Sequence, residues 1–267
     1  MNALDEFAGS VSVVVSSCDA FFDAWRPFAF FFRKFWPDCP FPVYLVANKL
    51  AVRSQFIRTI HVGRDQGWAT NMQLALAQID TPYLLYFQED YFLTAPVDPE
   101  QIARDFRYAV EKKAAALCFR DLSALEPEFG RTAERIGVVP SESKGRTRLQ
   151  VTLWQRLALA GILEPGEDAW EMEARGSART RDLAMLSYTR NAGAPIPYLM
   201  SAIVRGLWTP EAHALCRAHH FRIRPAFRSI LASTKSGRRR ARALGRVRYV
   251  LARLCQSGRR IDLDVNS

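Results

Sequence analysis

The sequence predicts an α/β fold built on a mostly parallel sheet that is flanked by helices. Strand-like and helix-like segments alternate with short loops over the first 120 residues, which is typical of a doubly wound sheet. The strand-like segments are continuous apolar runs, as expected for strands buried on both faces. The 267 residues are 49% hydrophobic and 24% charged, a globular composition that excludes disorder and a disulfide-rich miniprotein.

The elements of the first half follow from these patterns. Five short apolar runs predict strands at residues 11–15, 43–47, 57–62, 83–87 and 114–119. Three stretches with apolar residues at three- and four-residue steps predict helices at residues 21–36, 71–79 and 100–113. Pro37 and Pro40 end the first helix, while Asp98 and Pro99 supply the N-cap and first residue of the third.

The second half is less regular. Residues 120–148 are polar and rich in proline and glycine, and we expect them to form loops and short strands over the carboxyl edge of the sheet. Helical spacing returns at residues 151–163, and a short helix is expected at 169–175 with Asp168 at its N-cap. A last helix is expected from Ser236 onward, with an apolar stripe of leucine and valine surrounded by arginine.

The net charge of +10 is concentrated in this last part of the chain. Residues 212–261 contain fourteen Lys or Arg and no Asp or Glu, whereas residues 1–211 are close to neutral. We therefore expect a domain at 1–211 that carries the chemistry and a basic helical extension at 212–267. Three roles are open for the extension: a solvated basic helix, a helix lying on an anionic membrane surface, and a nucleic-acid contact, which is disfavoured because aromatic residues are scarce between the arginines.

Several protein classes are disfavoured. The five cysteines are widely spaced and show no zinc-ligand pattern, and the N-terminus lacks the features of a secretory signal. The expected location is therefore the cytoplasm, with peripheral contact at the inner face of the plasma membrane if the basic extension binds lipid. No P-loop, dinucleotide-binding glycine motif or hydrolase nucleophile elbow is present.

The strongest chemical signal is the run Gln88-Glu89-Asp90 at the end of the strand predicted at 83–87. Ligands of open α/β sheets bind at the carboxyl ends of strands, and carboxylates placed there can hold Mg²⁺ or Mn²⁺ against phosphate oxygens. A solvated acidic turn would produce the same sequence, so a metal-diphosphate site is one of two interpretations.

Two further groups could carry chemistry. Glu167 and Asp168 precede the short helix at 169–175, where a carboxylate can cap the helix or act as a general base. The stretch from Asp65 through Trp68 to Asn71 is a glycine-containing loop that opens a helix, and its backbone N–H groups could meet a phosphate or a base edge.

Together with the first strand and its Ser16-Ser-Cys-Asp19 loop, these residues resemble a bacterial glycosyltransferase of the GT-A type, similar to family-2 enzymes. Gly67-Trp68 and Asn71, the strand ending in Gln88-Glu89-Asp90, and the later residues Trp154, Trp170 and Glu173 continue the pattern. The resemblance covers about residues 10–210. It implies a GT-A-like (Rossmann-like) fold and a sugar transferase of cell-surface polysaccharide synthesis, for example of lipopolysaccharide.

The resemblance also implies roles for individual residues. Donor-nucleotide contacts would come from Ser16, Asp19, Asp65, Trp68, Asn71, Gln88 and Glu89. Asp90 matches the last residue of the family's Asp-x-Asp motif, which reaches a divalent metal (Mn²⁺ or Mg²⁺) on the diphosphate. Gln88 replaces the first Asp of that motif, which puts the metal requirement in question. Asp168, with Glu167 next, would take the proton from the hydroxyl of a glycan or lipid-linked acceptor in an inverting transfer.

Three other functions are compatible with parts of this sequence. A binding-only relative with a degenerate sugar-nucleotide site would explain Gln88. A basic nucleic-acid-binding protein would explain the extension. A nucleotidyltransferase would share the strand-end carboxylates, but its phosphate loop should be richer in glycine and basic residues than Val15-Ser-Ser-Cys-Asp19.

Overall fold

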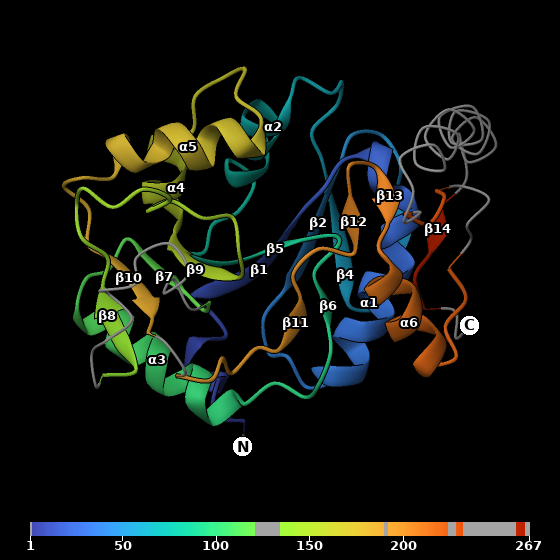
Figure 1. Ribbon diagram of the computed structural model, residues 1–267, viewed down its shortest axis with the longest axis horizontal. Helices are drawn as coiled ribbons and strands as arrows, with labels where there is room; N and C mark the ends of the chain where they lie inside the picture. Colours follow the sequence, from blue (N-terminus) through green and yellow to red (C-terminus); the bar gives the residue numbers. More distant parts are fainter. Residues whose placement is uncertain (1, 121–133, 190–191, 224–227, 232–259, 265–267) are drawn as a thin grey trace.

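The computed structural model describes residues 2–120, 134–189, 192–223, 228–231 and 260–264. Its centre is an eight-stranded sheet in the order β4-β2-β1-β5-β9-β7-β10-β8 (Figure 1). Six of these strands run in one direction, while β9 and β8 run antiparallel to their neighbours. The predicted α/β class with a mostly parallel sheet flanked by helices is confirmed.

One half of the sheet is fully parallel. It contains β4 (Ile57–His61), β2 (Val43–Ala47), β1 (Val11–Ser16) and β5 (Tyr83–Gln88). The chain moves outward from β1 to β2 and β4 and then returns to place β5 on the other side of β1. The strand order therefore reverses between β1 and β5, and this reversal is where open α/β sheets leave a crevice at the carboxyl ends of their strands.

The other half of the sheet corrects one prediction. Residues 151–163 were expected to be helical, but Thr152–Gln155 form β9, and only Arg156–Ile162 form the helix α4. β9 lies between β5 and β7 (Ala116–Cys118), and its residues Leu153 and Trp154 are buried in different apolar clusters on opposite faces of the sheet. A strand buried on both faces does not alternate apolar and polar residues, so its short apolar run resembles the start of a helix. The sheet ends with β10 (Met185–Tyr188) and β8 (Ile136–Val138), which the sequence had not resolved.

Helices cover both faces of the sheet. α1 (Phe22–Phe35) and α3 (Pro99–Glu111) pack in one apolar cluster, and α2 (Trp68–Leu76), α4 and α5 (Ala169–Arg179) pack in the other. The side chain of Asp98 accepts a hydrogen bond from the Gln101 N–H, which confirms the predicted N-cap of α3. α5 extends four residues beyond the predicted end of its helix at Arg175. Two short 3₁₀ helices precede the strand β1 and the helix α1, at Asp5–Phe7 and Asp19–Phe21.

Short strands and one helix complete the described chain. They form the pairs β6 (Phe92–Leu93) with β11 (Tyr198–Leu199), β12 (Ile203–Val204) with β13 (Leu207–Trp208), and β3 (Val52–Arg53) with β14 (Ile261–Asp262), beside α6 (Pro210–Ala218). α6 buries Ala212 and Cys216 in the same apolar cluster as α1. The helix predicted from Ser236 onward lies outside the described residues, so the proposed division at residue 211 stays a prediction. In the described part of the chain, no helix combines the length and apolarity needed to span a bilayer.

Candidate functional site

A cavity of about 830 Å³ opens where the strand order reverses. Its floor is formed by the carboxyl ends of β1 and β5 with the residues that follow them, Ser16–Cys18 and Gln88–Asp90. The starts of α2 and α5 form one wall, and the β12–β13 hairpin with Ser201 forms the other (Figure 1). Of the ten predicted site residues, Ser16, Asp65, Trp68, Asn71, Gln88, Glu89 and Asp90 line this cavity, while Asp19, Glu167 and Asp168 do not.

Two adjacent carboxylates are buried at the cavity floor. Glu89 is 7% exposed and Asp90 is 6% exposed. Burial, with the neighbouring Asp90 charge, raises the pKa of Glu89 well above its ordinary range, and burial raises the pKa of Asp90 to about 7. The Arg228 guanidinium opposes both pKa shifts by its positive charge. The floor of the cavity can therefore hold protons near neutral pH and lose them to a bound cation.

The Asp90 side chain has one engaged and one free oxygen. Its Oδ2 accepts a hydrogen bond from the Ile203 N–H at 3.1 Å, whereas its buried Oδ1 has no hydrogen-bond partner among the described residues. Oxygen ligands of this kind suit Mg²⁺ or Mn²⁺. However, within the described ranges no group of three or more His, Cys, Asp or Glu side chains is placed to hold a metal ion. Among the described residues, the cavity floor thus offers the neighbouring carboxylates of Asp90 and Glu89 but no closed all-protein metal site.

Polar contacts organise the wall at the start of α2. The indole N–H of Trp68 donates to Ser16 Oγ at 2.9 Å, which ties α2 to the end of β1. Asp65 Oδ1 accepts from the Gly67 N–H at 3.1 Å and from Asn71 Nδ2 at 2.8 Å. Gly67 has a φ of 90°, a backbone conformation that favours glycine. These contacts hold the predicted loop in one shape at the helix N-terminus.

Asp19 lies outside the lining and is 2% exposed. Its Oδ1 accepts from the Asn48 N–H at 2.9 Å, and its two oxygens also accept from the N–H groups of Lys49 and Leu50. The Asp19 N–H in turn donates to Asn48 Oδ1 at 3.0 Å. These bonds join the loop after β1 to the loop after β2. In this structure Asp19 therefore holds in place the loop after β1, which forms part of the cavity floor.

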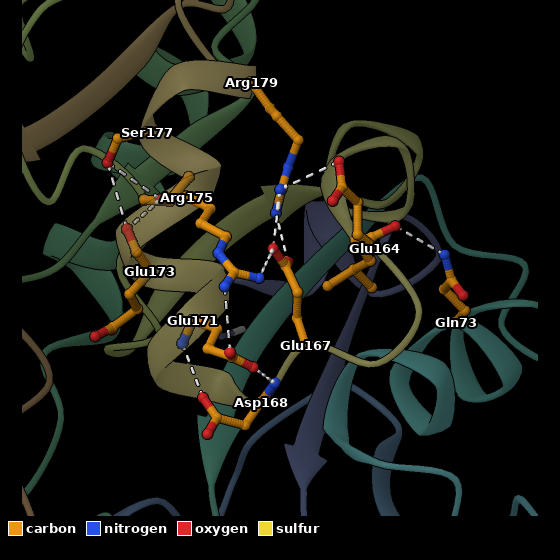
Figure 2. A network of polar contacts seen from close by, with 11 residues as sticks. Gln73, Glu164, Glu167, Asp168, Glu171, Glu173, Arg175, Ser177 and Arg179 are labelled. Atoms are coloured by element: carbon orange, nitrogen blue, oxygen red, sulfur yellow. Dashed lines mark hydrogen bonds and ion pairs between the residues drawn. The ribbon is translucent and has the colours of Figure 1, made fainter.

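Glu167 and Asp168 are engaged at the start of α5 (Figure 2). Both oxygens of Glu167, which is 3% exposed, accept from the Arg179 guanidinium, at 3.1 Å and 2.6 Å. Asp168 Oδ1 accepts from the Glu171 N–H at 2.8 Å, and Glu171 Oε2 accepts from the Asp168 N–H at 3.0 Å. This reciprocal pair is a capping box. The next two residues, Ala169 and Trp170, reach the cavity.

Sequence reasoning missed the β12–β13 hairpin. Its turn residues Arg205 and Gly206 have φ values of 52° and 75°, as in the tight turns that favour glycine, and both line the cavity. Arg228 links the hairpin turn to α1: it donates to the Gly206 carbonyl at 3.2 Å and forms two 3.0 Å hydrogen bonds with the Asp23 carboxylate. Gly206 by itself is only a weak turn signal in the sequence, and nothing local indicates where the hairpin docks.

No protein-family model matches the sequence, and no curated protein matches it. Among solved structures, the chain is similar to residues 1–349 of TarS from S. aureus, with a TM-score of 0.44 and 14% identity over 67% of this chain and 60% of that chain. It is similar to a CMP:2-keto-3-deoxy-manno-octonic acid synthetase complexed with CTP, with a TM-score of 0.45 and 11% identity over 79% and 98% of the two chains. Glucosyl-3-phosphoglycerate synthase from Mycobacterium tuberculosis, complexed with Mn²⁺ and UDP-glucose, follows with a TM-score of 0.35 and 10% identity over 58% and 59%.

The chain thus spans 60% of the length of the TarS fragment that it matches. The TM-scores of the three similarities lie between 0.35 and 0.45. The fold class therefore rests on the strand order and layers of this chain.

Proposed function

We propose that this protein is a glycosyltransferase that moves a sugar from a nucleotide-sugar donor to a hydroxyl group of an acceptor. The observation that supports this function best is the cavity at the β1–β5 reversal with two buried carboxylates at its floor. A crevice at that point of an open α/β sheet is the general place for a nucleotide. A volume of about 830 Å³ is sufficient for a ligand of that size.

The charges of the lining favour a donor bound together with a cation. Among the described residues that line the cavity, three are carboxylates, Asp65, Glu89 and Asp90, and one is an arginine, Arg205. In their ionised forms these carboxylates would repel a diphosphate unless a cation accompanied it. In our proposal Asp90 and Glu89 would hold Mn²⁺ or Mg²⁺, which would supply positive charge to a diphosphate leaving group. Ser16, Asp65, Trp68, Asn71 and Gln88 surround the nucleotide, and Asp19 positions the loop beneath it.

Asp168 is the proposed general base. Its Oδ1 caps α5, while its Oδ2 has no hydrogen bond among the described residues, and the side chain is exposed beside the two residues that reach the cavity. Oδ2 takes the acceptor hydroxyl proton, the acceptor oxygen forms a bond to the anomeric carbon, and the bond from that carbon to the diphosphate breaks with inversion. We do not assign this step to Glu167, because Arg179 binds both of its oxygens and burial shields it.

Two variants of Asp168 separate its proposed role as a general base from its role as the N-cap of α5. Asparagine caps helices about as well as aspartate, so Asp168→Asn should keep the stability of the protein and lose at least about a hundredfold in transfer rate. Asp168→Ala should lose the same activity and, in addition, about 1 kcal/mol of unfolding free energy. Donor binding should be unchanged in both variants. Transfer by Asp168→Asn at the wild-type rate would remove Asp168 as the base.

A second function, binding of a sugar nucleotide without transfer, is favoured by Gln88 and by the engaged carboxylate of Glu167. The two functions give different results with the wild-type protein. The binding-only function predicts donor affinity without release of nucleoside diphosphate in the presence of any acceptor, whereas a transferase releases it in proportion to acceptor consumed.

A further inference from the structure

One tryptophan stands apart from the other five. Trp170 is 79% exposed, whereas Trp25, Trp36, Trp154 and Trp208 are at most 1% exposed and Trp68 is half-buried. Trp170 lies in the first turn of α5 and lines the cavity. An exposed indole adds little to folding, because the hydrophobic contribution of a side chain requires its removal from water. Its place at the cavity mouth points to a ligand instead.

The backbone that carries Trp170 is fixed by several contacts, although the side chain itself is exposed. Figure 2 shows how α5 is held at its start: the capping box fixes the backbone at Asp168, and Arg179 grips Glu167 just before the helix. The Glu167 carbonyl also accepts from the Ala69 N–H at 3.2 Å, which joins this turn to α2. Because these contacts fix the backbone at Trp170, binding of a ligand has to order only the two side-chain torsions of the indole.

We propose that Trp170 is a stacking platform for a pyranose ring of the acceptor, which identifies the acceptor as a carbohydrate. The inference rests on the proposed transferase function. The donor takes the inner crevice at the ends of β1 and β5, so the exposed mouth is left to the second substrate. Trp170 is two residues from Asp168, the proposed base, so both residues belong to the start of α5.

The chemistry of an exposed indole fits a sugar ring. One face of a pyranose presents C–H groups with partial positive charge, and the face of an indole is negative. The hydroxyl groups at the ring edge keep their contact with water in this arrangement, so no polar group is left unsatisfied. The opposite wall offers the exposed Val204 and Arg205, an apolar group and a hydrogen-bond donor.

The test uses the distinctive exposure of Trp170. Iodide quenches exposed indoles, so in this chain it should report mainly on Trp170. The protein, saturated with UDP and Mn²⁺, is titrated with methyl β-glucoside, methyl β-galactoside and methyl N-acetyl-β-glucosaminide, with sorbitol as an open-chain control. We expect at least one pyranoside, and not sorbitol, to protect the indole from iodide.

Variants then show whether the binding of the pyranoside depends on the Trp170 side chain. Trp170→Phe keeps an aromatic face and should bind the protecting pyranoside within about threefold of wild type by calorimetry, while Trp170→Ala should bind it about tenfold more weakly. Leu157→Ala is the matched control, because Leu157 is 73% exposed on α4 and does not line the cavity, and it should change nothing. UDP affinity should be the same in all four proteins.

The outcomes separate this inference from the proposed function. The proposal that Trp170 is a stacking platform would be overturned by any of three results. No pyranoside protects the indole, Trp170→Ala binds the pyranoside as tightly as wild type, or Trp170→Ala loses affinity for UDP and not for the pyranoside. Pyranoside binding that depends on Trp170 in a protein that transfers no sugar would instead refute the transferase function and leave the carbohydrate site standing.

Discussion

At the scale of single residues, the unusual feature is a pair of buried neighbouring carboxylates on the path of the proposed donor. Glu89 and Asp90 lose hydration by burial, which favours their protonated forms, and Arg228 only partly compensates. Buried charge of this kind weakens a fold unless a partner neutralises it. Residues that reduce stability in this way are frequent at functional sites.

This imbalance predicts how stability depends on pH. The pKa of Asp90 is about 7 in the folded protein and about 3.9 in the unfolded chain, so the native state binds more protons between these values and its stability falls as pH rises through that window. Asparagine carries no such penalty. Asp90→Asn should therefore gain about 1–3 kcal/mol relative to wild type between about pH 5 and pH 8.

Urea unfolding of both proteins at the two pH values measures this gain. Asparagine can still accept the hydrogen bond from the Ile203 N–H, so the variant tests charge rather than packing. A stability difference that is equal at both pH values would show that Asp90 ionises normally in the folded protein.

At the scale of elements, the β12–β13 hairpin depends on a residue from the basic part of the chain. Arg228 and Asp23 form an ion pair with side-chain exposures of 9% and 4%, and Arg228 also donates to the carbonyls of Ala20 and Gly206. Its guanidinium lies 4.9 Å from the ring centroid of Phe21. One side chain thus connects the loop after β1 with the hairpin turn, and both of these segments line the cavity.

Removal of one partner should leave an uncompensated buried charge. We expect Arg228→Ala and Asp23→Ala each to lose about 3 kcal/mol of unfolding free energy, and the double variant to lose much less than the sum. Arg228→Lys should recover only part of the loss, because an ammonium cannot reproduce the planar fork. Additive losses in a double-mutant cycle would mean that the two side chains are not coupled.

The elements also show what sequence patterns can and cannot reveal. The strands β1, β2 and β5 and the helix α3 were predicted well, because long apolar runs and a proline-containing cap are local signals. β9 was predicted as a helix because its burial on both faces depends on β5 and β7, which the local pattern does not include. The β12–β13 hairpin was not predicted, because its contact with Asp90 joins residues that are 113 positions apart in the sequence.

The same distinction applies to the site. Gln88, Glu89 and Asp90 could be predicted because a buried strand runs directly into them, and the loop with Asp65, Trp68 and Asn71 because it opens a helix. Asp19 could not be separated from the lining residues by sequence, since its bonds go to backbone N–H groups of a loop 29 to 31 residues away. The capping task of Asp168 was visible in the sequence, but the ion pair of Glu167 with Arg179 was not.

At the scale of the whole molecule, the end of the chain returns to the body. β14 pairs in parallel with β3, Ile261 and Leu263 are buried, and Asp264 accepts hydrogen bonds from Ser54 and Gln55. The side chains of Arg53 and Asp262 also form an ion pair. The most basic part of the chain, residues 232–259, lies between two attached segments and outside the described residues, and its contact with a membrane stays a prediction.

Truncation should therefore destabilise the body itself. Removal of residues 260–267 deletes two buried apolar side chains, uncovers the apolar surface beneath them and should cost about 2–4 kcal/mol in thermal or urea unfolding, while removal of residues 265–267 alone should cost little. Equal stability of the two truncated proteins would show that β14 adds nothing. A test of membrane binding should accordingly replace arginines within 232–259 by glutamine and keep β14 in place.

We propose that the cavity at the β1–β5 reversal binds a nucleotide-sugar with the help of Asp90. Thermal unfolding in the presence of a panel of nucleotide-sugars, with and without Mn²⁺, measures this most directly, because a ligand that binds only the native state raises the unfolding temperature. We expect at least one nucleoside-diphosphate sugar to stabilise the wild-type protein more strongly with Mn²⁺, and Asp90→Asn to lose this metal-dependent part. Stabilisation by no donor, or a shift in Asp90→Asn that keeps its full dependence on Mn²⁺, would contradict it.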